Sequence, residues 1–230
     1  MDSIKAIFFD LGDTLASTDP PYLYRIAQAM REAGLEISNE EFDVEYLKAD
    51  YQLFLKYRER GGITPEEHRK WFLPILYDNV LSGQDVNQFR IKVREALSNI
   101  KFDRVARPSA VELLDYLRAK GYTLAIISNN DGTTEEKCDE VSIREYFDII
   151  LDSTNVDMIK PDSRIFEHAL DKLELLPSEA IHIGDMYGAD VMGGMNAGLD
   201  VIWLNHRKIE GLSHPLVKEV SGLAEIKNLF

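Results

Sequence analysis

The sequence is short of cysteine and of long apolar runs. Its 230 residues include one cysteine, Cys138, which rules out an internal disulfide framework and fits a reducing compartment. No stretch reaches the length needed to span a bilayer. Lys5, Asp10 and Asp13 interrupt the segment where a signal peptide would have its apolar core. These absences predict a cytoplasmic protein without a membrane partner.

Positive charge is also scarce. Lysine and arginine total 26 against 40 aspartates and glutamates, so the formal net charge is -14 at pH 7. This excess of negative charge argues against nucleic acid or an anionic membrane as a partner. We interpret the acidity mainly as a means of keeping the surface solvated. The sequence leaves the oligomeric state open, because no exposed apolar stripe stands out.

Five short apolar runs are present instead of long ones. They cover residues 4–9, 122–127, 148–151, 181–183 and 201–204. The runs do not alternate with polar residues, which is typical of strands covered on both faces. Helical periodicity lies between the later runs. The fold class predicted is therefore α/β, with an open, doubly wound parallel sheet.

The first connection is far longer than an ordinary crossover. Roughly ninety residues separate the strand that ends at Asp10 from the helix expected after Ser109, whereas most such connections are much shorter. This interval has the periodicity of several helices. We predict an α/β core formed by residues 1–16 and 105–230, and an inserted all-α cap of residues 17–104. We also expect the cap to cover the site and to open at hinges in 16–20 and 104–108.

Local signals predict where several helices begin. Ser/Thr-x-x-Glu capping boxes start at Ser38, Thr64, Ser109 and Thr133. Pro74 is expected to kink or end the helix that contains it. Several aromatic residues of the cap are expected to form the core of the helical bundle, namely Tyr51, Phe54, Tyr57, Trp71 and Phe72.

Polar side chains follow four of the predicted strands. In parallel sheets, ligands bind beyond the carboxyl ends of the strands. Asp10-Leu11-Gly12-Asp13-Thr14 follows the first strand, and Ser128-Asn129 follows the second. Lys160 lies some distance after the third, and Gly184-Asp185 follows the fourth, with Asp190 five residues later. Clustered carboxylates repel one another unless a cation neutralises them, and Mg²⁺ prefers oxygen ligands and substrate phosphates. The pattern predicts a Mg²⁺ site for chemistry on a phosphoryl group.

These four segments, in this order and on these elements, resemble the motifs of the haloacid dehalogenase superfamily of hydrolases. The resemblance covers the whole chain, including a helical cap after the first motif. It implies that Asp10 is the nucleophile and also binds Mg²⁺, and that the backbone carbonyl of Gly12 coordinates the metal. It further implies that Asp185 is a metal ligand and that Asp190 holds metal-bound water.

The same resemblance assigns the remaining motif residues. Ser128 matches the phosphate-binding hydroxyl, with the Asn129 amide beside it. Lys160 matches the lysine that neutralises both the nucleophile and the phosphoryl group. Thr14 matches a hydroxyl that orders the first loop. The implied activity is hydrolysis of a small phosphorylated metabolite through an aspartyl-phosphate intermediate.

One position departs from the family pattern. Phosphatases of this family carry a second aspartate two residues after the nucleophile, where it protonates the leaving group, but this sequence has Gly12 there. Asp13 either replaces that acid or is a turn residue that bonds its own backbone, and we favour the turn. Two other functions remain open. One is a 2-haloacid dehalogenase, whose first motif also lacks the second aspartate but which uses no metal and has no Gly-Asp in the fourth motif. The other is a binding or regulatory protein with weakened catalysis.

Overall fold

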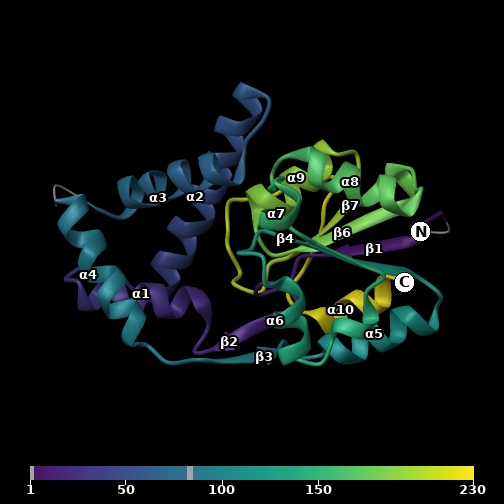
Figure 1. Ribbon diagram of the computed structural model, residues 1–230, viewed down its shortest axis with the longest axis horizontal. Coiled ribbons are helices and arrows are strands. Elements are labelled where there is room, and N and C mark those ends of the chain that lie inside the picture. Colours follow the sequence, from purple (N-terminus) through teal and green to yellow (C-terminus); the bar gives the residue numbers. More distant parts are fainter. Residues whose placement is uncertain (1–2, 82–84) are drawn as a thin grey trace.

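The computed structural model describes residues 3–81 and 85–230. Its strands are β1 (Ala6–Phe9), β2 (Ala16–Asp19), β3 (Asp103–Ala106), β4 (Thr123–Ser128), β5 (Ile149–Asp152), β6 (Ala180–Gly184), β7 (Asp200–Leu204) and β8 (Lys218–Val220). The longer helices are α1 (Tyr22–Glu32), α2 (Asn39–Arg60), α3 (Pro65–Val80), α4 (Val86–Asn99), α5 (Ala110–Ala119) and α8 (Ser163–Leu173). The shorter ones are α6 (Thr134–Glu140), α7 (Ser153–Val156), α9 (Gly193–Asn196) and α10 (Leu223–Ile226), together with a π-helical segment, Tyr187–Met192. Figure 1 shows α1 to α4 as one group beside the sheet and its covering helices.

A six-stranded sheet forms the centre of the core. Its order is β5-β4-β1-β6-β7-β8, and every neighbouring pair is parallel. The chain proceeds from β1 to β4 and β5 on one side, then crosses to β6, β7 and β8 on the other. The predicted doubly wound α/β fold is confirmed, and β1 and β6 flank its switch point. The short strand β8 was missed because it holds only three residues, KEV.

Both faces of the sheet are buried, as the uninterrupted apolar runs predicted. Along β1, Ile7 and Phe9 pack with α5 and α10, whereas Ala6 and Phe8 pack with α8. This alternation follows from the two-residue period of a strand. Figure 1 shows α5 and α10 on one side of the sheet and α8 and α9 on the other. The sheet therefore holds its strand ends rigidly between two helical layers.

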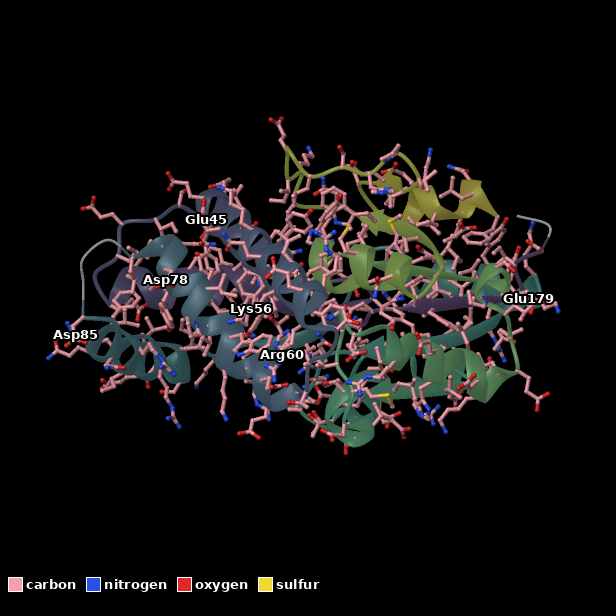
Figure 2. All side chains as sticks on the ribbon, turned by 90° about the horizontal axis from the view of Figure 1, so that it is seen from above. Glu45, Lys56, Arg60, Asp78, Asp85 and Glu179 are labelled. Atoms are coloured by element: carbon pink, nitrogen blue, oxygen red, sulfur yellow. The ribbon has the colours of Figure 1, made fainter. Side chains whose placement is uncertain are left out.

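An antiparallel pair of strands joins the helical group to the core. β2 pairs with β3, with Ala16 opposite Ala106 and Asp19 opposite Asp103. Helices α1 to α4 surround a separate apolar cluster that contains Leu23, Phe42 and Phe89. In Figure 2 the long axis of the molecule runs from Asp85, beside α4, to Glu179, at the far end of the core. Among the described residues, no helix is both long enough and apolar enough to cross a membrane.

The helix-start predictions had mixed outcomes. Ser38 and Thr64 each form a complete capping box. The boxes at Ser109 and Thr133 were wrong. Ser109 has φ 64° and no side-chain cap, because the turn places it in the left-handed region. The Thr133 hydroxyl instead donates to Asp131 at 2.6 Å. The helix containing Pro74 does not end there but continues to Val80.

The cap aromatics do not all lie in the bundle core. Tyr51, Phe54 and Tyr57 of α2 contact apolar clusters that include core residues, such as Tyr187 and Ile159. Trp71 packs against the cluster that contains Ile159, whereas Phe72 also packs against the cluster inside α1–α4. The bundle-core prediction therefore holds for Phe72 and was wrong for the other four, because α2 presents apolar residues both to the bundle and to the sheet domain. Helix α2 is thus docked directly on the core.

Helix α2 also meets α3 through cation–π contacts. Lys56 lies 4.3 Å and Arg60 5.0 Å from the centroid of the Trp71 ring. Figure 2 labels both cations on α2. These contacts tie α3 to the part of α2 that reaches the core, because Trp71 lies in α3.

Candidate active site

The carboxylate of Asp10 lies where the sheet topology reverses. Asp10 follows β1 directly, and its backbone N–H donates to the carbonyl of Ile183 in β6 at 2.9 Å. Its side chain is buried, with a residue exposure of 7%. Burial raises the pKa of Asp10 to about 8, the charges of Asp190 and Asp185 act in the same direction, and Lys160 opposes them. A carboxylate in this position needs a cation beside it to remain ionised.

Lys160 supplies one such cation. Its Nζ donates to Asp10 Oδ1 at 2.7 Å and to Asp190 Oδ1 at 2.6 Å. Burial opposes the charged form, but the two carboxylates raise the pKa of Lys160 above its usual range. Two hydrogen bonds fix its backbone, since Lys160 N–H donates to Asn129 Oδ1 at 2.9 Å and Asn129 Nδ2 donates to the Lys160 carbonyl at 2.8 Å. The side-chain amide of Asn129 therefore positions the lysine.

Three carboxylates meet beside this lysine. One oxygen from each of Asp10, Asp185 and Asp190 lies within 4.8 Å of the others. Burial raises the pKa of Asp185 to about 6, with Asp190 and Asp13 adding to the effect and Arg207 opposing it. All three donors are hard oxygen atoms, and their mutual repulsion is what a divalent cation would relieve. The residues present therefore fit Mg²⁺.

The side chain of Asp190 is fixed by contacts with Lys160, His182 and the Met186 N–H. Its Oδ1 accepts from Lys160 and lies 3.0 Å from His182 Nε2, while its Oδ2 accepts from the Met186 N–H at 2.9 Å. Burial alone would raise the pKa of Asp190, but Lys160 and His182 lower it below its usual range. Gly184 makes this placement possible, because a Cβ on it would lie 2.2 Å from Asp190 Cγ.

The first loop contacts Asp185 directly through Thr14 and indirectly through Asp13, which shares Arg207 with Asp185. The Thr14 hydroxyl donates to Asp185 Oδ1 at 3.2 Å. Arg207 donates from Nη1 to Asp185 Oδ2 at 2.5 Å and from Nη2 to Asp13 Oδ2 at 2.6 Å. The Ser17 hydroxyl occupies the other oxygen of Asp13 at 2.5 Å. Asp13 has φ 55°, as suits an aspartate in a tight turn, but its side chain bonds these neighbours instead of its own backbone.

Sequence reasoning missed two functional candidates. Arg207 follows β7 within Asn205-His206-Arg207, so the strand-end rule could have found it. Asp50 lies inside α2, where no local pattern marks it, yet its carboxylate accepts from the N–H groups of Gly188 and Ala189. A Cβ on Gly188 would lie 2.4 Å from the Asp50 carbonyl oxygen. The cap and the loop that carries Asp190 are therefore in direct contact.

A cavity of about 580 Å³ opens onto these groups. Asp10, Gly12, Ser128 and Lys160 line it from the core, and α1, α2 and α3 line it from the other side with residues that include Arg25. The prediction that the inserted helices cover the site is confirmed. The hinge motion stays a prediction. The structure brings together every site residue that the sequence pointed to.

Comparisons with known proteins agree with this arrangement. A family model for haloacid dehalogenase-like hydrolases matches residues 4–198. The chain is 29% identical to glyceraldehyde 3-phosphate phosphatase of Methanothermobacter thermautotrophicus, over 97% of this chain and 99% of that protein. It is 28% identical to the pyrimidine 5'-nucleotidase YjjG of Escherichia coli, over 97% and 96% of the two chains.

A solved structure has the same fold over nearly the whole chain. The putative HAD-hydrolase YfnB of Bacillus subtilis, bound to magnesium, superimposes with a TM-score of 0.63 at 21% identity and covers 98% of both chains. With the family model spanning both the core and the helical insertion, the conclusion is direct: this chain belongs to the haloacid dehalogenase-like hydrolases.

Proposed function

We propose that this hydrolase, a phosphatase by its relatives, depends on Mg²⁺ and acts on a small phosphorylated metabolite through an aspartyl-phosphate on Asp10. One observation carries the proposal. Asp10, Asp185 and Asp190 converge within 4.8 Å at the base of a cavity, and Lys160 bridges two of them. This combination suits attack on phosphorus, because a carboxylate nucleophile, a cation site and a lysine that can neutralise phosphoryl oxygens lie side by side.

The residues that would hold Mg²⁺ are Asp10 and Asp185, through their carboxylates, and Gly12, through its backbone carbonyl. Asp190 would stabilise the site from beside these ligands by holding a water molecule of the ion. When bound, Mg²⁺ would neutralise charge on the phosphoryl oxygens and on the crowded carboxylates. A magnesium-bound neighbour of the same fold supports this choice of metal.

The proposed phosphate contacts come from the ends of β4 and of the loop after α7. Ser128 is buried, yet its hydroxyl makes no hydrogen bond within residues 3–81 and 85–230, and it lines the cavity. Because the side chain of Asn129 is occupied by Lys160, its backbone N–H is the group that we assign to the phosphate. The ammonium of Lys160 completes the set.

The reaction divides into two balanced displacements. A carboxylate oxygen of Asp10 bonds to phosphorus as the ester P–O bond breaks, and the bond pair leaves with the alcohol oxygen. Water then attacks the same phosphorus, releases inorganic phosphate and restores the carboxylate. Since Gly12 has no acid to offer, the departing oxygen takes its proton from solvent.

The alternative functions have less support. A dehalogenase would explain Gly12, but it would leave the clustered Asp185 and Asp190 without a use. A binding protein would not need Lys160 between two carboxylates. We also propose that the enzyme is cytoplasmic and that it consists of a core, residues 1–16 and 105–230, and a cap, residues 17–104.

The Asp10→Asn variant tests the proposal. We expect it to lose Mg²⁺-dependent phosphate release from an activated aryl phosphate while its thermal unfolding stays cooperative. Asp200→Asn, at the exposed start of β7, is the matched control and should retain full activity. Turnover by Asp10→Asn above a few per cent of wild type would remove Asp10 as the nucleophile.

A further inference from the structure

The cavity contains a buried cation without a matching carboxylate. Arg25, on α1, is 6% exposed and lines the cavity across from the catalytic residues. Its Nη2 donates to the Thr18 hydroxyl at 3.1 Å, and its guanidinium carbon lies 3.7 Å from the centroid of the Phe102 ring. Its buried Nε has no hydrogen-bond partner. A buried guanidinium whose partners are a neutral hydroxyl and an aromatic face is unusual, because buried charges are normally paired with an opposite charge.

The other cations of the cavity all have carboxylate partners. Lys160 pairs with Asp10 and Asp190, and Arg207 pairs with Asp13 and Asp185. Lys137 pairs with Asp131, and Arg104 pairs with Glu140. Within the described residues that line the cavity, Arg25 is the lysine or arginine that lacks an ion pair. The missing negative charge is expected to come from the ligand.

The position of Arg25 relative to the nucleophile limits the ligand. Gly12, in the nucleophile loop, bridges to Ala16 at the start of β2, and Thr18 lies two residues further along that strand. At ~3.3 Å per residue, about 7 Å of strand separates Ala16 from Thr18. Asp10 and Arg25 also line the same cavity of about 580 Å³. A short ligand with a phosphate at one end and a second anionic group at the other therefore fits between them.

We infer that Arg25 binds a second anionic group of the substrate, so that the preferred substrate is a short-chain phosphate ester bearing a carboxylate or a second phosphate. This inference rests on the proposed function, since it takes Asp10 as the site of phosphoryl attack. The planar guanidinium suits either anion, because both present two oxygens to a pair of N–H donors. Phe102 and Thr18 hold the guanidinium in place without neutralising it.

The test compares esters that differ only at the far end. The probes are 3-(phosphonooxy)propanoate, propane-1,3-diyl bisphosphate and 3-hydroxypropyl phosphate. Wild type should favour at least one of the two probes with an anionic far end, the carboxylate or the second phosphate, over the hydroxyl probe by tenfold or more in kcat/KM. Arg25→Gln should reduce that ratio to within about threefold, since a lost charged hydrogen bond costs roughly 10- to 100-fold. Arg118→Gln is the control, because Arg118 pairs with Asp148 away from the cavity lining, and it should keep the wild-type ratio.

A binding measurement separates this inference from the proposed function. In the Asp10→Asn background, 3-phosphonopropanoate should raise the melting temperature more than propylphosphonate does, and Arg25→Gln should abolish the difference. If no ester is hydrolysed but this Arg25-dependent shift appears, the proposed function fails and the anion site stands. If esters are hydrolysed with a ratio that Arg25→Gln does not change, the anion site is overturned. Should Arg25→Gln not fold, Arg25→Lys decides, and it must lower the ratio at least threefold.

Discussion

The carboxylate of Asp50, on the cap helix α2, accepts a hydrogen bond from the backbone N–H of Ala189 at 3.1 Å. The neighbouring N–H of Gly188 donates to the same side chain. Asp190, which holds Lys160 and His182, is the next residue along the chain. The docked position of the cap and the geometry of the catalytic loop are therefore linked through one buried side chain.

Replacing Asp50 with alanine should loosen the docking of the cap. Two buried N–H groups would lose their acceptor, which costs about 1–3 kcal/mol for each group left unsatisfied. We expect a lower melting temperature and faster proteolysis at the junctions 16–20 and 104–108. Asp50→Asn keeps one acceptor oxygen and should fall between alanine and wild type. Wild-type proteolysis rates in Asp50→Ala would contradict the link.

The stability of the wild type should also depend on pH through Asp50. Burial raises the pKa of Asp50 to about 8, and the N–H groups of Gly188 and Ala189 oppose this shift. The native state thus binds the proton of Asp50 more tightly than the unfolded chain does. Protonation therefore stabilises the folded protein at low pH, and this contribution is lost as pH rises from about 4 to 8. Asp50→Asn does not titrate, so its stability relative to wild type should increase across that window. Denaturant unfolding at pH 5, 6.5 and 8 measures the difference, and parallel curves would refute it.

Gly184 should tolerate no side chain. A Cβ there would lie 2.2 Å from Asp190 Cγ, so Gly184→Ala must displace the carboxylate that anchors Lys160. We expect destabilisation by about 1–3 kcal/mol and loss of most phosphatase activity. Gly222→Ala is the control, because Gly222 has extended backbone and nothing within 4 Å of the added atom. An active, stable Gly184→Ala variant would show that activity does not require the Asp190 carboxylate in its present position beside Lys160.

The absence of an acid at Gly12 should appear in the choice of leaving group. Aryl phosphates should be hydrolysed far faster than alkyl ones, because a positioned acid is worth about 10²–10⁴-fold to a poor leaving group. Gly12→Asp should raise activity on alkyl phosphates. The substitution has room, since Gly12 lacks a positive φ and the nearest atom to its added Cβ is Asp10 Oδ2 at 4.0 Å.

Asp13 provides the complementary probe for that prediction. Its two oxygens already bond Ser17 and Arg207, so Asp13→Asn should lower the rates on alkyl and aryl phosphates by a similar, modest factor. A collapse confined to alkyl phosphates, by orders of magnitude, would show that Asp13 serves as the acid after all.

Mg²⁺ should stabilise the folded protein even without substrate. An ion that binds only the native state at 100 times its Kd adds about 2.7 kcal/mol. We expect the melting temperature to rise with Mg²⁺ in wild type and to rise far less in Asp185→Ala. Asp200→Ala should keep the wild-type response. A full Mg²⁺ response in Asp185→Ala would place the ion elsewhere.

Local rules in the sequence determined the fold class and the catalytic edge of the sheet. Apolar runs without alternation indicate strands buried on both faces, and parallel strands bring their carboxyl ends to one edge. Asp10, Ser128 and Asp185 were therefore found from the residues that follow each run. The Ser38 and Thr64 caps were found because a capping box involves only four consecutive residues.

Tertiary structure alone decided which side chains complete the site. Arg207 and Asp13 are 194 residues apart, and Asp50 and Ala189 are 139 apart, so no local spacing encodes either contact. The lack of an ion pair at Arg25 likewise cannot be predicted from sequence, because it depends on which side chains the tertiary structure places around the guanidinium. Secondary structure and strand order follow from short-range chemistry, whereas ion pairs across the cavity depend on how the cap and the core pack together.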